Sequence, residues 1–202
     1  MDPKFVVFTP GRTGSHLIMG NLRQHYTQRV NIIHTHNPLF KASDEYFIGI
    51  LSKRRNLFDA LLSSFVGMKT NEFSSYTDKK IDTFFVPPTR FEDTWNYYKV
   101  FYDLIDRTQF LDTIEIYYED MLADSIYLSS KLGLDGHINL KASDKSPRKS
   151  QDYILNIDEL KELYLQLENT GVAEETVSII KNTIIDDLND IAKSHNGNRV
   201  VI

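Results

Sequence analysis

Residues 11 to 16 of the chain, with the sequence GRTGSH, place an arginine, two hydroxyl side chains and two glycines directly after an apolar run. The run from Phe5 to Phe8 is typical of a buried strand, and an amphipathic helix is predicted to begin at Ser15. A strand that turns directly into a helix leaves the first N–H groups of the helix unpaired at the positive end of its dipole. This arrangement predicts an anion site, most often one for phosphate.

The loop lacks the signature of a nucleotide triphosphatase, in which a glycine, four residues and then Gly-Lys-Ser/Thr bind phosphates and magnesium. Gly11 and Gly14 are too close together, and the loop contains no lysine. The expected anion ligands are therefore the Arg12 guanidinium and the amides and hydroxyls of Thr13, Gly14 and Ser15. An ordinary strand-to-helix turn with a surface arginine is the alternative that this loop alone leaves open.

A second set of polar residues follows the apolar segment 45–52. Arg55 comes at the end of this predicted strand, and Asp59 and Ser63 lie four and eight residues further on, near one side of the next predicted helix. An arginine fork and a hydroxyl that converge there can hold a second phosphate. Arg54 is the alternative ligand, because neighbouring residues of a strand point to opposite faces.

His34 and His36 are two residues apart in the apolar segment 30–36, so on a strand both side chains point to the same face. Metal binding is disfavoured, because the chain has no cysteine and no obvious carboxylate partner completes a ligand set. A general base that titrates near neutral pH is the favoured function. A structural role at the strand end is the alternative for either histidine taken alone.

Strands and helices are predicted to alternate along the chain, which indicates a parallel sheet covered by helices on both faces. The predicted strands are 4–8, 30–36, 45–52 and 112–119. The predicted helices are 15–26, 56–68, 90–105, 121–134, 157–168 and 173–194, and the stretch 71–88 lacks periodicity. We therefore predict an α/β fold of three layers with a central sheet of four to five strands. Ligands of such a sheet bind at the carboxyl ends of its strands.

The composition limits the class of protein. A chain of 202 residues that are 41% hydrophobic can bury one sizeable core, which predicts a single domain over residues 1–202. The net charge of -5 argues against general nucleic-acid binding. The chain has no cysteine, and no segment is typical of a targeting signal or a membrane span, so a soluble cytoplasmic protein is expected.

Together these segments resemble the sulfotransferases that use 3'-phosphoadenosine-5'-phosphosulfate (PAPS) as the sulfate donor. The loop TPGRTGSHL is similar to the family's 5'-phosphosulfate loop, and RNLFDALLS to its 3'-phosphate element, in which an arginine precedes a serine by eight residues. HTHNP resembles the segment with the catalytic histidine, and IYYEDML the strand end whose tyrosine lies beside the adenine. The resemblance covers roughly residues 5 to 130 and implies a P-loop-like fold.

The resemblance implies a role for each matching residue. Contacts to the donor fall on Arg12, Thr13, Gly14, Ser15, His16, Arg55, Ser63 and Tyr118. The basic stretch SPRKS is similar to a later loop over the 3'-phosphate and adds Arg148 and Lys149. His36 is the implied general base, with Arg12 and His34 as the other catalytic residues. The family requires no metal.

The implied reaction transfers the sulfuryl group to a hydroxyl or amine of a small-molecule, glycan or peptide acceptor and leaves adenosine 3',5'-bisphosphate (PAP). Arg12 and His34 stand where cytosolic members carry lysines, and Leu17 stands where they often carry a tryptophan. Two alternatives are therefore kept. One is a non-catalytic module of the same fold that binds a nucleotide or a sulfated ligand, and the less favoured one is a small-molecule kinase of the P-loop type.

Overall fold

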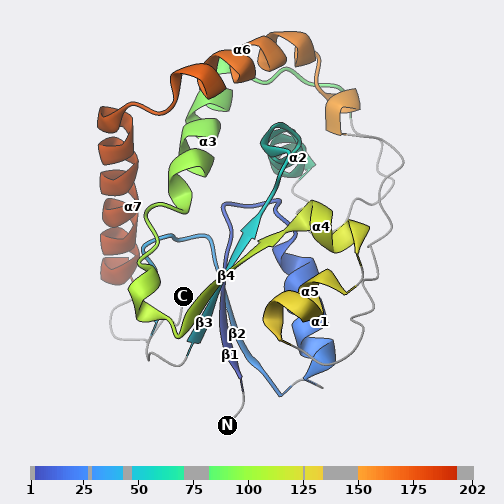
Figure 1. Cartoon of the computed structure of the whole chain (residues 1–202). Helices are drawn as coiled ribbons and strands as arrows, with labels where there is room; N and C mark the ends of the chain where they lie inside the picture. Colours follow the sequence, from blue (N-terminus) through green and yellow to red (C-terminus); the bar gives the residue numbers. More distant parts are fainter. Residues whose placement is uncertain are drawn as a thin grey trace.

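The computed structural model describes residues 3–26, 29–42, 47–70, 82–124, 126–133 and 150–194. Four strands form one sheet: β1 (Lys4–Phe8), β2 (Asn31–Thr35), β3 (Phe47–Lys53) and β4 (Asp112–Tyr117). The strands lie in the order β2-β1-β3-β4, and every neighbouring pair is parallel (Figure 1). The predicted α/β fold with a central parallel sheet is confirmed.

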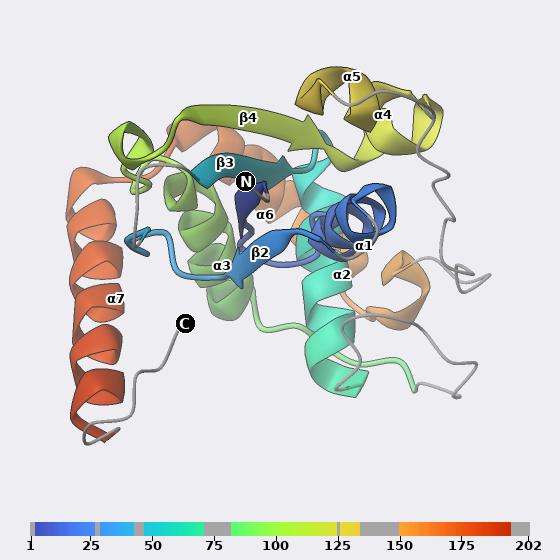
Figure 2. The same cartoon turned by 90° about the horizontal axis from the view of Figure 1, so that it is seen from below.

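Helices cover both faces of this sheet. The α-helices in the described residues are α1 (Ser15–His25), α2 (Leu57–Thr70), α3 (Pro88–Phe101), α4 (Tyr118–Ala123), α5 (Tyr127–Leu132), α6 (Ile157–Thr170) and α7 (Glu174–Ser194). α1, α4 and α5 pack on one face, and the end of α3 packs on the other (Figure 2). Across the part of the chain that the structure describes, every helix is too short or too polar to span a membrane.

The order of the strands fixes where the polar segments meet. The chain runs from β1 to β2 on one side and then returns to the other side of β1 to form β3. In open parallel sheets, ligands bind at the carboxyl ends of strands whose connections leave in opposite directions. The segments after β1 and β3, which carry Arg12 and Arg55, follow adjacent strands and therefore lie side by side at this edge.

Residues of β1 alternate between two apolar clusters, as the two-residue period of a strand requires. Phe5 and Val7 pack with α1, whereas Val6 and Phe8 pack toward Phe101 at the end of α3. These four β1 residues have almost no exposed surface. Burial on both faces explains why the strand is a continuous apolar run in the sequence.

A third apolar cluster joins α2, α3 and α6 around Trp95. The Trp95 side chain is completely buried, and its indole N–H donates to Glu168 of α6 at 2.8 Å. α3 therefore contacts this cluster along most of its length and the sheet at its end, around Phe101. Its position relative to the strand ends is fixed from both sides.

The sequence predicts one helix over 121–134, but α4 and α5 are separate. The Asp124 carboxylate accepts the N–H of Ile126 at 2.9 Å, and this local turn competes with continuation of the helix. The strand that the sequence extends to residue 119 ends at Tyr117, because α4 begins at Tyr118. β4 therefore passes directly into α4, whereas a loop separates the end of β1 from the start of α1.

Candidate functional site

The loop between β1 and α1 has an unusual backbone. Gly11 and Gly14 have φ angles of 116° and 90°, and Arg12 has a φ of 50°. Arg12 is the one non-glycine residue with a positive φ in the described part of the chain, and this conformation costs about 1 kcal/mol or more. Turns that mix left-handed and right-handed residues aim successive N–H groups at one point and bind anions there. The backbone thus has a conformation suited to an anion site.

A buried series of hydroxyl groups holds this loop against the end of β3. Thr13 is 2% exposed, and its Oγ1 donates to Ser52 Oγ at 2.9 Å and accepts from Thr9 Oγ1 at 2.6 Å. Ser52 Oγ donates in turn to the Thr13 carbonyl at 2.9 Å. Ser15 is also buried. The Thr13 hydroxyl, which the sequence places around the anion, instead braces the loop from inside.

Gly14 packs against Tyr118, the first residue of α4. A Cβ atom on Gly14 would lie 2.4 Å from Tyr118 Cδ2 and 3.3 Å from Met121 Cε. Glycine is therefore required here by its positive φ and by the aromatic ring beside it. A larger residue at this position would disturb the packing of α4 whether or not the loop binds phosphate.

Arg12 reaches the helix that follows β3. Its Nε donates to Ser63 Oγ of α2 at 2.8 Å, across 51 residues of sequence. The Arg12 carbonyl accepts from Arg54 Nη1 at 3.3 Å. The structure therefore brings Ser63 to Arg12, whereas the sequence pattern pairs Ser63 with Arg55.

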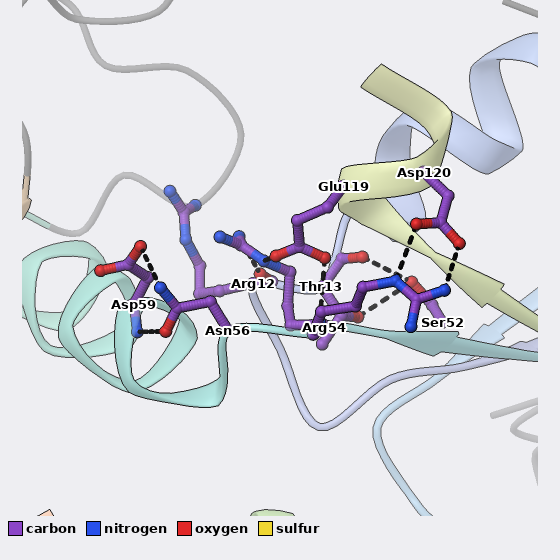
Figure 3. Close-up of polar contacts among 9 residues, drawn as sticks. Arg12, Thr13, Ser52, Arg54, Asn56, Asp59, Glu119 and Asp120 are labelled. Carbon is purple, nitrogen blue, oxygen red and sulfur yellow. Dashed lines mark hydrogen bonds and ion pairs between the residues drawn. The ribbon is translucent and has the colours of Figure 1, made fainter. Parts of the chain in front are cut away.

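Two arginines after β3 are paired with two carboxylates after β4, and Figure 3 labels Arg54, Glu119 and Asp120 of this group. Arg54 Nε donates to Glu119 Oε1 at 2.6 Å, and Arg55 donates to both carboxylate oxygens of Asp120, each at 2.7 Å. β3 ends at Lys53, so both arginines lie in the turn after the strand, where the alternation of a strand does not apply. Hydrogen bonds from Arg55 lower the pKa of Asp120. We refer to these two pairs as the arginine clasp.

The two pairs of the clasp differ in exposure. The Arg54 side chain is 16% exposed and lies over the Tyr118 ring, whereas the Arg55 side chain is 58% exposed and lies over the Tyr117 ring. A guanidinium has five N–H donors, and Asp120 takes a donor from each of two Arg55 nitrogens. Arg55 therefore keeps donors that can meet an anion from solvent.

Asp59, which the sequence places near the second phosphate, is part of the start of α2. Asn56 Oδ1 accepts the Asp59 N–H at 3.1 Å, and Asn56 Nδ2 donates to Asp59 Oδ2 at 2.8 Å (Figure 3). This reciprocal pair satisfies groups of the first helical turn. The Asp59 carboxylate thus helps to cap the N-terminus of α2.

Three histidine rings lie in a row beside the loop. The ring centroids of His16 and His34 are 5.4 Å apart, and those of His34 and His36 are 4.8 Å apart. His36 Nδ1 lies 2.9 Å from the Thr9 carbonyl oxygen. Because a carbonyl oxygen can only accept, Nδ1 carries the proton and the lone pair of the neutral ring is on Nε2. His36 is exposed, so Nε2 belongs to a side chain that solvent reaches.

His34 is uncharged at neutral pH. Burial, followed by the positive charges of His36, His16 and Arg23, lowers the pKa of His34 to about 4. The pKa of His16 is also lowered, chiefly by burial. His34 Nε2 is buried and has no hydrogen-bond partner among the described residues. His34 therefore supplies no positive charge next to the loop.

Three tyrosines to which the sequence analysis gives no role contact the site. The hydroxyls of Tyr97, Tyr98 and Tyr102 donate to the carbonyl oxygens of His36, Gly11 and Ser52, respectively. When tyrosines occur in an apolar helical segment, their hydroxyls are expected to need hydrogen-bond acceptors within the protein. The identity of those acceptors depends on tertiary structure, which helical periodicity does not contain.

Two expected donor ligands, Arg148 and Lys149, lie outside the described residues. Within the described ranges, no group of three or more histidine, aspartate and glutamate side chains is arranged to hold a metal ion. No protein-family model, curated protein or solved structure matches the chain. Function must therefore be inferred from the residues themselves and their geometry.

The low pKa of His34 predicts how stability depends on pH. The unfolded chain binds the His34 proton near pH 6.5 and the folded state only near pH 4, so a fall in pH between these values favours unfolding. His34→Phe removes this titration. Between pH 7 and pH 5 the variant should lose about 1 kcal/mol less free energy of unfolding than the wild type, after allowance for partial exposure. Denaturant unfolding at both pH values measures this, and equal losses would show that the fold does not depress the pKa of His34.

Proposed function

We propose that the chain is a PAPS-dependent sulfotransferase. The observation that carries the proposal is the hydrogen bond between Arg12 and Ser63. It joins the loop that resembles a 5'-phosphosulfate site to the helix that resembles a 3'-phosphate site. Both phosphates of the donor are attached to one ribose, so elements that bind them must lie within the span of a single nucleotide. The alternative, an ordinary strand-to-helix turn with a surface arginine, does not require this contact.

The 5'-phosphosulfate would bind at the β1–α1 loop. The first N–H groups of a helix have no partner within it, and the positive end of the helix dipole favours an anion there. In α1 the Leu17 N–H donates to the Gly14 carbonyl at 3.0 Å, so the amides proposed for the anion are those that precede Leu17. Arg12 adds a permanent positive charge, because a guanidinium keeps its proton at any ordinary pH. Arg12 therefore stabilises charge on the leaving phosphate and donates no proton to it.

The 3'-phosphate would bind at the start of α2. Arg55 is largely exposed and has N–H donors besides those that contact Asp120. Arg54 is paired with Glu119 and mostly buried, which makes it a structural cation. The difference in exposure thus favours Arg55 over Arg54 as the residue that reads the phosphate.

His36 would act as the general base. Its Nδ1–H donates to the Thr9 carbonyl, which leaves the lone pair of Nε2 to accept the proton of the acceptor hydroxyl or amine. The acceptor atom then forms a bond to sulfur, and the bond from sulfur to the bridging oxygen of the donor breaks. PAP leaves with the electron pair of that bond. The residues mainly position the reactants and stabilise charge on the leaving group.

A second candidate function is a binding module of the same fold that holds the nucleotide without turnover. It is favoured by His34, which stands where cytosolic sulfotransferases carry a second lysine. A pKa of about 4 leaves His34 neutral, so the site lacks that positive charge. Transfer of radioactive sulfate from PAPS to a panel of hydroxyl and amine acceptors separates the two functions, because the module would bind PAP and transfer nothing.

Arg12→Ala should lower turnover about 100-fold and weaken PAP binding by less than about 10-fold. The strongest demand on the Arg12 charge arises in the transition state, and a group that acts there affects turnover more than ground-state binding. Sulfate transfer and calorimetry measure the two effects. Ser63→Ala is the matched control, because it removes the hydroxyl that accepts from Arg12 Nε and keeps the cation. Equal losses of turnover and affinity in Arg12→Ala would contradict this role.

Arg55→Ala should weaken PAP binding about 30-fold and leave AMP binding nearly unchanged, because AMP lacks the 3'-phosphate. Asp120→Asn tests whether Arg55 acts through the clasp, since it alters the partner of Arg55 and retains the guanidinium. The Asp120 variant should bind PAP at least as tightly as the wild type. If both variants weaken PAP equally, or if Arg55→Ala weakens AMP as much as PAP, Arg55 does not read the 3'-phosphate.

His36→Ala should lower turnover roughly 100-fold and preserve PAP affinity, which is the usual result of removing a general base. His34→Phe is the control and should lose less turnover than His36→Ala. A His36→Ala protein with the turnover of the wild type would move the assignment to His34 or His16.

A further inference from the structure

Three tyrosine hydroxyls form a row across the strand ends. Tyr97 contacts the residue after β2, Tyr98 contacts the loop after β1, and Tyr102 contacts the end of β3. These three strands are neighbours in the same order, β2-β1-β3. One helical segment therefore contacts each of the three segments on which the proposed site depends.

The helix that presents this row is firmly held. Phe91, Trp95 and Phe101 of α3 have no exposed surface, and they belong to clusters on α2, on α6 and on the sheet. Tyr98 is itself 4% exposed. Because close-packed interiors are rigid, α3 keeps a fixed position relative to the sheet, and so do the tyrosine hydroxyls that it carries.

His36 is held at two points. Its ring donates through Nδ1 to the Thr9 carbonyl at 2.9 Å, and its own carbonyl accepts from the Tyr97 hydroxyl at 2.8 Å. His36 lies just beyond β2, which ends at Thr35. Thr35 also anchors this strand end, because its carbonyl accepts the Thr9 N–H at 3.1 Å and its hydroxyl accepts the Asn37 N–H at 3.0 Å. The Tyr97 hydroxyl is the group that holds the His36 carbonyl itself, so its loss would loosen the peptide that carries the His36 ring.

The Tyr98 hydroxyl has a separate target. It donates to the Gly11 carbonyl at 3.0 Å and lies 3.2 Å from the position that a Cβ on Gly11 would occupy. Gly11 precedes Arg12, whose positive φ is unfavourable for a non-glycine residue. A hydrogen bond to the peptide between them opposes rotation of that peptide toward a relaxed conformation.

We propose that Tyr97 and Tyr98 are separate positioning residues, Tyr97 for the tautomer and orientation of His36 and Tyr98 for the backbone of the β1–α1 loop. Their effect on catalysis rests on the proposed sulfotransferase function. Their effect on the histidine and on the loop does not. Adjacent residues of one helix thus control two different parts of the same site.

Nitrogen NMR of the histidine side chains tests the role of Tyr97 without any substrate. At a pH where His36 is neutral, the wild-type protein should carry the His36 proton on Nδ1. In Tyr97→Phe the ratio of the Nε2–H form to the Nδ1–H form should rise about tenfold, and in Tyr98→Phe it should keep its wild-type value. Both variants remove one oxygen and keep the ring, which is half-buried at Tyr97 and buried at Tyr98.

Amide hydrogen exchange tests the role of Tyr98. In Tyr98→Phe the amides of residues 11–14 should exchange about tenfold faster, whereas in Tyr97→Phe they should exchange as in the wild type. Tyr164→Phe is the matched control, because it removes a phenol hydroxyl that bonds to Glu168 on α6, away from the strand ends. It should change neither the His36 tautomer nor exchange in the loop.

The proposal is overturned if Tyr97→Phe keeps the wild-type His36 tautomer, if Tyr98→Phe keeps wild-type exchange in the loop, or if both variants produce the same changes. PAP calorimetry extends the test to function: Tyr98→Phe should bind PAP about fivefold more weakly, and Tyr97→Phe within twofold of the wild type. A wild-type protein that fails to bind PAP would refute the proposed function, and the two NMR results would still decide the roles of the tyrosines.

Discussion

The buried hydrogen bonds among Thr9, Thr13 and Ser52 are the constraint on which the rest of the site depends. They tie the loop after β1 to the end of β3 from inside the protein, where buried polar groups without hydrogen bonds would be costly. With the loop fixed in this way, Arg12 is held at a positive φ. Thr9 also offers its carbonyl to His36, so the same loop orients both the proposed cation and the proposed base.

The arginine clasp explains how a protein with a net charge of -5 can concentrate cations at one edge of its sheet. A mostly buried guanidinium such as that of Arg54 needs a partner to offset its loss of hydration, and Glu119 supplies it at 2.6 Å. The more exposed Arg55 pair is screened by solvent and contributes little to stability. The clasp thus combines a structural pair with a pair whose arginine can interact with a ligand.

Much of the fold could be predicted from the sequence because strands buried on both faces are continuous apolar runs. Segment 5–8 and segment 47–51 are of this kind. The break after α4 cannot be predicted in this way, because a single turn at Asp124 is a local effect that helical periodicity does not detect. Positions of single residues were harder to predict than elements. The sequence assigns Gly14 to an anion cradle, whereas the neighbour that requires a glycine there in the structure is Tyr118, which is distant in sequence.

The polar partners within the site could not be predicted from spacing. A separation of eight residues places Arg55 and Ser63 near one side of a helix, yet Ser63 bonds to Arg12 and Arg55 bonds to Asp120. Each of these partners comes from a different strand end, and only the order of strands in the sheet brings them together. The same holds for the tyrosines of α3. Their apolar surroundings are visible in the sequence, but the carbonyl groups that they contact are not.

Competition between nucleotides in a calorimetric titration tests the proposed function most directly. Arg12 and Arg55 are the separate cations proposed for the 5' and 3' positions of one nucleotide, and the loop lacks the lysine that binds triphosphate in P-loop kinases. Titration of the full chain with PAP and, separately, with ATP and magnesium should show that PAP binds at least about tenfold more tightly, which corresponds to about 1.4 kcal/mol. Tighter binding of ATP with magnesium than of PAP would contradict the account.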